Sequence, residues 1–573
     1  MRRQVIFVCF VLAYPFHIVA AQSPHDEKAV SSSAAASSLA ASGISSSPSA
    51  ATSPAGISAP SPLSEALRFY RKGDFDAAIE KYQQLLQERP NTPDGYTGLA
   101  SVYLKRKDVR HADETISKGM EKIDSPTMRV ALGEVLFREG KIPEAEEQWV
   151  KVINSGYPSA RAYLGLARVR KAISMYASAK RMIDKAHELD PNDPDIQRAW
   201  INTLGMKERI NYLEGYLASE NNDDAETRSN AEFYLEYLKA RQKEPKRVCR
   251  LASNVTSTET ELVRLLLDPK HLRGYGLAVQ LNGKKTNLML DTGAGGILVD
   301  RGIAEKAGIT KLSETRVGGI GDKGTNPGWI GLASSIKVGN LEFKDCPVYV
   351  LEKRSVVGED GLIGAGVFAD FTVDIDFPNE KLRLKELPQR PDEAPRVPEL
   401  KTETADADSP EDSSDSEHQP TDPAKTSPRS GPFDRYIAPE MKSYTPVYRF
   451  GHDLLVPTKI GNVPNKLFLL DTGAFTNQIT AAAAREITKV HGDDTIVKGL
   501  SGSVKKVYSA DKAILQFGHL RQENQDLLSF DLTSVSDNEG TEVSGTLGFV
   551  MLHLLDLKID YRDGLVDFDY KPR

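Results

Sequence analysis

The spacing of apolar residues divides this chain into segments of three kinds. Over residues 63–243 apolar side chains recur every three or four positions, which is typical of helices with one buried face. From Tyr275 onward, short alternating runs separated by glycine-rich turns predominate, which is typical of β structure with few helices. Residues 22–62 and 386–435 show neither period. The sequence therefore predicts a multidomain protein, with an all-α region first and all-β structure after it.

The helical segment repeats itself. Its units open on Gly98-Leu99-Ala100, Ala131-Leu132-Gly133 and Gly165-Leu166-Ala167, and their glycines stand 35 and 32 residues apart. Small residues at these positions permit close crossing of paired helices. Over residues 63–195 the pattern resembles the tetratricopeptide repeat, and the helices after residue 195 are expected to be irregular or capping units. The resemblance implies a stacked solenoid, of the kind whose concave face commonly binds peptides.

The aromatic residues of these units are expected to fill the core between helices rather than to contact a ligand. Tyr82, Phe137 and Trp149 all fall on the packing positions of the repeat. The sequence therefore identifies no individual binding residue on the concave face.

The β segment contains two copies of one set of landmarks. Leu-Asp-Thr-Gly-Ala occurs at residues 290–294 and again at 470–474, each time after an apolar run. A glycine turn follows 70 residues after Asp291, at Gly361, and 74 residues after Asp471, at Gly545. One Asp-Thr-Gly alone is weak evidence, because Asp and Gly favour ordinary turns. Matched surroundings in both copies indicate two copies of one β lobe.

A third landmark, an apolar-Asp-aromatic strand, extends the match. Asp376 lies 85 residues after Asp291, and Asp560 lies 89 residues after Asp471. Residues 270–385 and 436–573 thus each resemble a lobe of the retropepsin-like aspartic proteases. In that family a later apolar-apolar-Gly turn supports the catalytic loop, and Ile363-Gly364 and Leu547-Gly548 match it. The resemblance implies two all-β retropepsin-like (acid protease) lobes that form a pseudo-dimer within one chain.

The resemblance also implies a catalytic pair formed by Asp291 and Asp471. Two carboxylates that share one proton can activate a water molecule and protonate the scissile carbonyl. The other motif residues are expected to support the pair: glycines permit the tight turn, threonines bond across the two-fold axis, and alanines leave room for substrate. These supporting residues are Thr292, Gly293, Ala294, Thr472, Gly473 and Ala474.

Two glycine-rich segments are candidates for the flaps that cover such a site. Residues 317–321 include Gly318, Gly319 and Gly321, and residues 499–502 begin with Gly499 and end with Gly502. Such segments are also found as plain turns. The first segment has no tyrosine of the kind found in pepsin's flap, which argues against pepsin-like handling of substrates.

The N-terminus has the features of an export signal. Arg2 and Arg3 precede an apolar stretch over residues 5–19, and small residues follow at positions 20 and 21. Residues 1–21 are therefore predicted to be a signal peptide, with a membrane anchor as the alternative. Residues 22–62 are predicted to be a disordered Ser/Ala/Pro-rich tether, and residues 386–435 a disordered acidic Pro/Ser-rich linker. Between positions 402 and 423 the linker has eight acidic residues and no Lys or Arg.

Composition narrows the classes of partner. The net charge of −7, from 73 basic and 80 acidic residues, gives no basic excess for nucleic acid. Removal of the signal leaves Cys249 and Cys346, and the sequence leaves open whether they form a disulfide. Neither these cysteines nor the ten histidines form a cluster with metal-ligand spacing, so no metal and no cofactor are predicted.

The sequence therefore favours an exported aspartic endopeptidase, a hydrolase whose helical repeats recruit a protein partner or peptide substrate. Export implies a periplasmic or extracellular location, with a bacterial envelope favoured, and no membrane association after signal removal. Two alternatives stay open: a non-catalytic peptide- or protein-binding scaffold that keeps the protease fold, and an enzyme whose lobes pair between chains.

Overall fold

The computed structural model describes residues 5–7, 61–218, 225–242, 249–253, 255–352, 360–391 and 433–571. The predicted signal peptide and tether lie outside the described residues, except for the strand β1 (Val5–Phe7) and the last two tether positions. Strand β1 pairs in parallel with β19 (Ile496–Gly499). Most of the predicted linker, from 392 to 432, also lies outside. Among the described residues, no helix combines the length and the apolar character needed to cross a bilayer.

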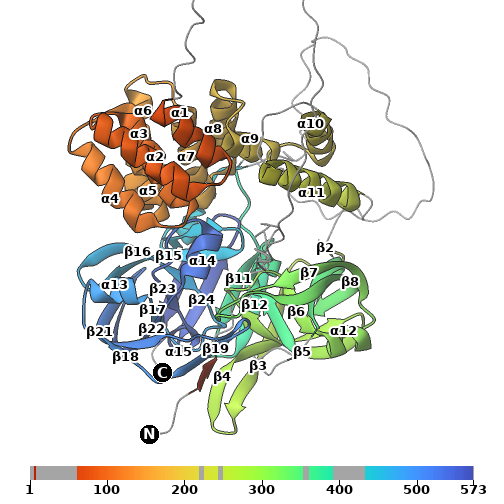
Figure 1. Ribbon diagram of the computed structural model, residues 1–573. Coiled ribbons are helices and arrows are strands. Elements are labelled where there is room, and N and C mark those ends of the chain that lie inside the picture. Colours follow the sequence, from red (N-terminus) through yellow and green to blue (C-terminus); the bar gives the residue numbers. More distant parts are fainter. Residues whose placement is uncertain are drawn as a thin grey trace, which may run out of the picture.

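The first region consists of antiparallel helices in succession (Figure 1). Several begin with proline in the first turn and a serine or aspartate cap, as in α1, where Ser61 accepts from the Ser64 amide. The helices are α1 (Pro62–Arg71), α2 (Phe75–Glu88), α3 (Pro93–Lys105), α4 (Val109–Met120), α5 (Pro126–Arg138), α6 (Ile142–Asn154), α7 (Ala160–Ala172), α8 (Tyr176–Leu189), α9 (Pro194–Ile201), α10 (Met206–Ala218) and α11 (Ala225–Gln242).

The repeated glycines mark the places where helices cross most closely. A Cβ added at Gly98 would lie 2.2 Å from the Tyr82 ring, and one at Gly133 or Gly165 would lie 2.5 or 2.4 Å from the Trp149 indole. Tyr82 and Trp149 are only 2% and 1% exposed. The prediction that these aromatic residues are core is confirmed, and their bulk explains the glycine at each crossing.

The β structure forms two regions that lie side by side below the helices, one green and one blue in Figure 1. The first comprises β2 (Arg250–Leu251), β3 (Thr258–Asp268), β4 (His271–Leu281), β5 (Lys284–Asp291), β6 (Ile297–Asp300), α12 (Arg301–Lys306), β7 (Thr310–Val317), β8 (Asn326–Val338), β9 (Leu341–Leu351), β10 (Gly361–Gly364), η1 (Ala365–Phe368), β11 (Phe371–Asp376) and β12 (Lys381–Glu386).

The second region follows residue 433. It comprises η2 (Pro439–Met441), β13 (Thr445–Pro446), β14 (Tyr448–Phe450), β15 (Asp453–Ile460), β16 (Val463–Leu470), β17 (Gln478–Ile479), α13 (Ala481–Arg485), β18 (Val490–Gly492), β19, β20 (Gly502–Ser503), β21 (Val507–Phe517), β22 (Leu520–Phe530), α14 (Thr533–Glu539), β23 (Gly545–Leu547), α15 (Phe549–Leu552), β24 (Leu555–Asp560) and β25 (Leu565–Tyr570).

The two regions have the same strand order. In the first it runs β3-β4-β5-β10-β6-β9-β8-β7, and in the second it runs β14-β15-β16-β23-β17-β22-β21-β18. Each region also has one extra pairing at the same place, β4 with β8 and β15 with β21. Matching order and matching closure show that the sequence landmarks recur in equivalent strands.

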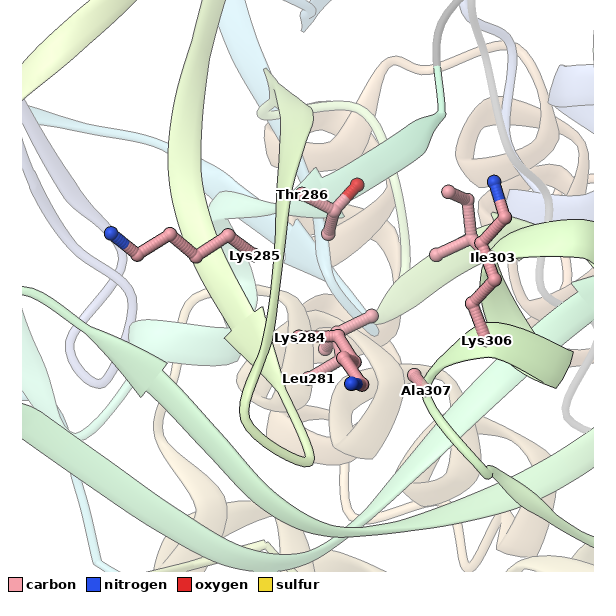
Figure 2. A pocket seen from close by; sticks show the side chains of 7 residues that line it. All are labelled: Leu281, Lys284, Lys285, Thr286, Ile303, Lys306 and Ala307. Atoms are coloured by element: carbon pink, nitrogen blue, oxygen red, sulfur yellow. The ribbon is translucent and has the colours of Figure 1, made fainter.

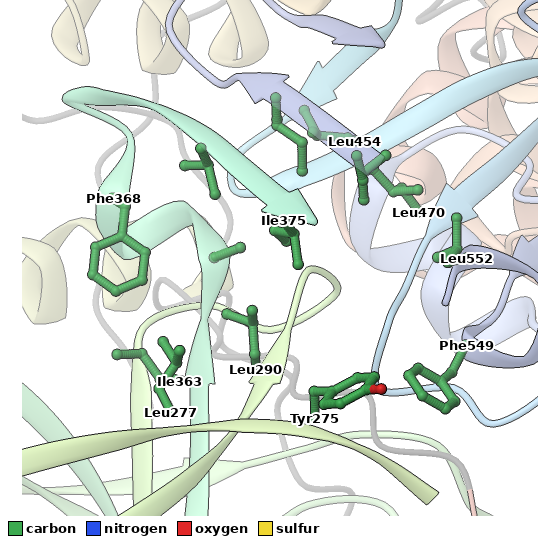
Figure 3. Close-up of a cluster of buried hydrophobic side chains, with 14 of the residues drawn as sticks. Tyr275, Leu277, Leu290, Ile363, Phe368, Ile375, Leu454, Leu470, Phe549 and Leu552 are labelled. Atoms are coloured by element: carbon green, nitrogen blue, oxygen red, sulfur yellow. The ribbon is translucent and has the colours of Figure 1, made fainter. Parts of the chain in front are cut away.

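Strands β11 and β24 pair with each other and join the two regions in one sheet. The core beneath is continuous: the ring of Tyr275 meets the ring of Phe549 edge-on at a centroid distance of 5.8 Å (Figure 3). Leu290 and Leu470, which precede the two aspartates, are both buried in this same core.

The helical region packs on the second β region. The Phe137 ring lies 6.3 Å from the Phe450 ring, and the Thr541 hydroxyl donates to the Phe137 carbonyl at 2.6 Å. The amide of Glu542 donates to the Arg138 carbonyl at 2.8 Å. These contacts seat helix α5 against the segment that follows α14.

Three predicted boundaries differ from the structure. The first β region begins before residue 270, because β3 pairs with both β4 and β12, contacts that the local sequence does not reveal. Helix α1 begins at Pro62, inside the predicted tether. The predicted linker has ordered ends, since the Arg390 guanidinium stacks on the Phe433 ring at 3.6 Å and pairs with Asp563 at 2.8 Å.

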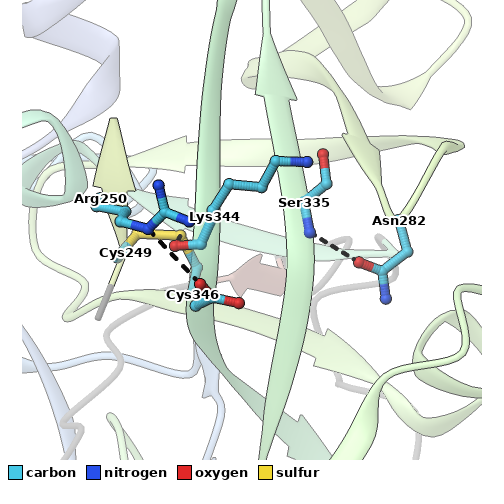
Figure 4. The surroundings of a disulfide bond; sticks show 7 residues. Cys249, Arg250, Asn282, Ser335, Lys344 and Cys346 are labelled. Atoms are coloured by element: carbon cyan, nitrogen blue, oxygen red, sulfur yellow. Dashed lines mark hydrogen bonds and ion pairs between the residues drawn. A yellow bond between two sulfur atoms is a disulfide. The ribbon is translucent and has the colours of Figure 1, made fainter. Parts of the chain in front are cut away.

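Cys249 and Cys346 form a disulfide, which resolves the question that the sequence left open (Figure 4). The bond ties the segment leading into β2 to strand β9, and β2 pairs with β9 beside it. The enclosed loop spans 97 residues and contains Asp291. The chain entering the first β region is therefore fixed covalently to its sheet.

Candidate active site

Asp291 is the last residue of β5, and its position follows from how that strand pairs. Strand β10 runs parallel to β5, with Gly364 opposite Asp291. A Cβ at Gly364 would lie 2.1 Å from the carbonyl oxygen of Ala294, so no larger residue fits there. The predicted glycine turn thus passes directly over the Asp-Thr-Gly-Ala loop and holds it.

Asp471 occupies the equivalent place after β16. Strand β23 runs parallel to β16, with Leu547 opposite Leu470, and the Asp471 amide donates to the Leu547 carbonyl at 3.1 Å. A Cβ at Gly548 would lie 2.3 Å from the Thr476 carbonyl oxygen. The same steric reason therefore explains the glycine turn of both copies.

The two threonines link the loops to each other. The Thr292 amide donates to the Thr472 hydroxyl, and the Thr472 amide donates to the Thr292 hydroxyl, each at 3.0 Å. The Thr292 hydroxyl donates to the Leu470 carbonyl at 2.8 Å, and the Thr472 hydroxyl donates to the Leu290 carbonyl at 2.9 Å. All four bonds are buried, so they hold the loops in one relative position.

The carboxyl groups of Asp291 and Asp471 face each other between these loops. They are hydrogen-bonded to each other and are 0% and 1% exposed. Amides inside each loop orient them: Gly293 donates to Asp291 at 2.9 Å, and Gly473 and Ala474 donate to Asp471 at 2.8 and 2.9 Å. A Cβ at Gly293 would lie 2.9 Å from Cγ of Asp471, so the glycine leaves the space that the second carboxyl fills.

Burial changes the acidity of both groups. It raises the pKa of Asp291 to about 7, against the opposing effect of the Gly293 hydrogen bond. The pKa of Asp471 is raised well above its usual range, first by burial and then by the charge of Asp291. Carboxyl groups at hydrogen-bond range do not both ionise readily, so the pair retains a shared proton. A neutral acid and a carboxylate are thereby available together.

The two glycine-rich segments meet each other. Gly318, Gly319 and Gly321 lie in the β7–β8 turn, and Gly499 and Gly502 belong to the β19–β20 hairpin. The Gly319 amide donates to the Ser501 hydroxyl at 3.0 Å, and the Ser501 amide donates to the Ile320 carbonyl at 2.9 Å.

Each turn also sends an apolar residue into a cluster of the other region. Leu500 packs in a cluster that includes Ala294, and Ile320 packs in one that includes Ala474. The predicted Ala294 and Ala474 are themselves buried, at 1% and 0% exposure. The two turns are therefore interlocked near the residues that follow each aspartate.

Sequence reasoning missed two charged residues beside the pair. Arg273 lies 18 residues before Asp291, and Asp453 lies 18 residues before Asp471. The positive charge of Arg273 lowers the pKa of Asp291, and the charge of Asp291 raises that of Asp453. Their equal spacing from the motif was the signal that could have found them.

Asp453 forms a second carboxyl pair with Glu539. The two carboxyls are hydrogen-bonded to each other, and Asp453 is fully buried. Burial raises the pKa of Asp453 to about 8 and that of Glu539 to about 9. The neighbouring His452 ring rests on Gly295, where a Cβ would lie 2.8 Å from its Cε1. This second pair therefore adjoins the active-site loop of the first region.

A cavity of about 360 Å³ lies elsewhere in the first region (Figure 2). Its lining includes Lys284, at the start of β5, and Ile303 and Lys306 of α12. Lys284 is seven residues from Asp291 along the strand, or roughly 23 Å at the usual rise per residue. The cavity is thus distinct from the aspartate pair. The described residues include no cluster of His, Cys, Asp and Glu suited to a metal ion.

Two family models match parts of the chain. Residues 277–367 match the model described as aspartyl protease, and residues 66–106 match the one described as TPR repeat. The first match covers Asp291 and the glycine turn that holds its loop. The protein thus consists of a helical TPR-like region followed by a β-rich region with an aspartyl protease domain.

One curated relative is the UBA domain-containing protein Mud1 of Schizosaccharomyces pombe (strain 972 / ATCC 24843). It is 35% identical over 115 residues, which are 19% of this chain and 33% of the relative. The chain thus spans about a third of the length of that relative.

Among solved structures, TTC0263, a thermophilic TPR protein of Thermus thermophilus, is similar over 31% of this chain and 97% of its own, with 18% identity and a TM-score of 0.27. Pseudomonas aeruginosa pilF is similar over 32% of this chain and 91% of its own, with 18% identity and a TM-score of 0.23.

Proposed function

We propose that this protein is an exported aspartic endopeptidase in which one chain supplies both halves of the active site. One observation carries the proposal: the carboxyls of Asp291 and Asp471 are hydrogen-bonded between loops that Thr292 and Thr472 lock together. The shared strand order supports the view that the two β regions are retropepsin-like lobes of a pseudo-dimer.

The chemistry follows from the state of the pair. A water molecule between the carboxyls gives a proton to the ionised one, which acts as general base, and attacks the peptide carbonyl. The protonated partner donates to the carbonyl oxygen, which forms a neutral tetrahedral diol. Proton transfer to the amide nitrogen then breaks the C–N bond and restores the shared proton. The buried setting keeps one proton in the pair throughout the cycle.

The interlocked turns serve as flaps in this proposal. Bonds from Gly319 and to Ile320 converge on Ser501, and they must separate before an extended peptide can reach the aspartates. Closure then excludes water other than the nucleophile. Gly499 supports the close contact, since a Cβ there would lie 2.3 Å from the Ile320 carbonyl oxygen.

The helical repeats are proposed to recruit protein partners or substrates to the protease. Helix α5 is seated on the second lobe through Phe137 and Arg138, so a protein bound by the repeats is held next to that lobe. Recruitment of this kind raises the local concentration of a cleavage site.

Export to the periplasm or beyond, with a bacterial envelope as the proposed setting, agrees with two features. The N-terminal 21 residues have the composition of a signal peptide. The Cys249–Cys346 disulfide is typical of an oxidising compartment.

The test is cleavage of a mixed peptide library by purified wild type, Asp291→Asn, Asp471→Asn and the exposed control Asp531→Asn. We expect each active-site substitution to lower kcat/KM at least about 100-fold, and the control to cleave like wild type. Equal activity in all four proteins would refute the proposal and favour the non-catalytic scaffold.

A mixing experiment separates pairing within a chain from pairing between chains. If lobes pair between chains, Asp291→Asn and Asp471→Asn chains refolded together form some sites with both aspartates intact. Pairing within one chain forms none. We expect no recovery of activity in the mixture, and light scattering should find a monomer as the active species.

A further inference from the structure

The two regions meet along strands β11 and β24, and their register has a local two-fold symmetry. Asp374 lies opposite Lys558, with Thr372 opposite Asp560 on one side and Asp376 opposite Asp556 on the other. The landmark Asp374-Ile-Asp376 of the first copy corresponds to Lys558-Ile-Asp560 of the second. Equivalent positions of the two copies thus face each other, and the local axis passes between Asp374 and Lys558.

A residue on a two-fold axis meets its own copy when identical units pair. If a first lobe paired with another first lobe, Asp374 would face Asp374. If a second lobe paired with another second lobe, Lys558 would face Lys558. Only the pairing of a first with a second lobe sets opposite charges against each other, and like charges placed directly opposite in antiparallel strands destabilise the pair.

The surroundings make this position sensitive to charge. The shared face of β11 and β24 also carries Asp376 and Asp556, which are 2% and 3% exposed, and Lys558 is the cation that these two strands supply. Its Nζ lies 3.3 Å from Asp567 and 3.7 Å from Asp556. A pair of first lobes would lack this lysine altogether.

Asp374 depends on the same balance. Its carboxyl is hydrogen-bonded to that of Asp556 across the junction and lies 3.3 Å from the Arg383 guanidinium. Burial and the charge of Asp556 raise the pKa of Asp374 to about 6, so the carboxyl is sensitive to added negative charge. A second Asp374 in the place of Lys558 would add that charge.

We propose that Asp374 and Lys558 select the pairing of the two unlike lobes and oppose the pairing of either lobe with its own kind. The partner that this surface fits is therefore the other lobe of the same protein. Duplicated lobes start with identical surfaces, and opposite charges on the axis are the smallest change that makes them unlike. The proposal rests on the proposed function only for its consequence, which is that each active site combines Asp291 with Asp471.

Charge reversal tests the proposal in the full-length chain. Lys558→Asp sets Asp against Asp on the axis, and Asp374→Lys sets Lys against Lys. We expect each single variant to lower Tm by at least about 2 °C. The double variant restores opposite charges between unlike lobes and should recover at least half of the lost Tm.

Rescue is specific to unlike pairing. If lobes paired with their own kind, the double variant would still set lysine against lysine at position 374 and aspartate against aspartate at position 558, and no rescue would occur. Lys459→Asp on an exposed position of β15 changes the net charge as Lys558→Asp does and should leave Tm unchanged. A double variant no more stable than the singles would overturn the proposal.

Two readouts keep this test separate from that of the proposed function. Tm reports lobe pairing even in a protein that cleaves nothing. Peptide cleavage should fall in the single variants and return in the double variant. Rescue of Tm with no cleavage in any variant, wild type included, would defeat the proposed function and leave the pairing rule standing.

Discussion

Thr292 and Thr472 each accept the other's amide hydrogen at 3.0 Å and each donate to the carbonyl that precedes the other's aspartate. Residues 180 positions apart thereby form a closed ring of four hydrogen bonds. The ring ties the two loops at their bases, so it fixes the separation of the carboxyl groups.

Replacement of Thr472 by valine removes its hydroxyl while keeping its shape. The Leu290 carbonyl loses its donor and the Thr292 amide loses its acceptor, so we expect a loss of about 1–3 kcal/mol in the free energy of unfolding. Denaturant titration measures this, and kcat should fall with it. Thr472→Ser keeps the hydroxyl and is the matched control, so an equal loss in both variants would contradict the role assigned to the ring.

Replacement of Gly293 by alanine is expected to abolish activity without unfolding the protein. The new Cβ would lie 2.9 Å from Cγ of Asp471, which forces the carboxyl groups apart. A misplacement of about 1 Å can cost roughly 100-fold in rate. Peptide cleavage and circular dichroism together measure the effect. Gly215→Ala in α10, where no atom lies within 4 Å of the added Cβ, should change neither signal.

The pH profile of kcat/KM should be displaced toward neutrality. Below a pKa of about 7 for Asp291 both carboxyls hold protons and no base is present. Activity should therefore rise as pH passes through about 7 and fall only when the more strongly raised pKa of Asp471 is passed. An acid limb near pH 4, the ordinary value for a carboxyl, would contradict the effect of burial.

The second carboxyl pair should make stability depend on pH. Asp453 and Glu539 have pKa values of about 8 and about 9 in the folded state, compared with about 4 when unfolded. Because the folded state holds these protons more tightly, stability is complete below about pH 4 and is lost as pH rises through 8 to 9. Tm measured from pH 5 to pH 9 should fall in wild type, and the fall should be smaller in Asp453→Asn.

Loss of the disulfide should destabilise the protein. A bond that closes a loop of 97 residues contributes up to about 4.7 kcal/mol in the chain-entropy model. We expect reductant to lower the Tm of wild type toward that of the Cys249→Ser/Cys346→Ser variant, whose own Tm should not respond to reductant. Equal sensitivity of both proteins to reductant would mean that the bond does not contribute.

Local sequence determined the order of the regions and the identity of the motif residues. Helical period, glycine spacing and alternating runs act over a few residues, so the repeats and the aspartate motifs could be predicted directly. The repeated 18-residue spacing to Arg273 and Asp453 was also present in the sequence, although their charges obscured it, because equivalent positions carry opposite signs.

Only the tertiary structure decided which residues meet. The Thr292–Thr472 ring, the interlocked turns around Ser501, the Cys249–Cys346 bond and the Asp374–Lys558 register all join segments about 100 residues or more apart. Such contacts depend on the packing of whole strands, and a strand's own residues do not specify its partner. The sequence by itself determined the chemistry available to each lobe, and folding determined that two buried carboxyls share one site.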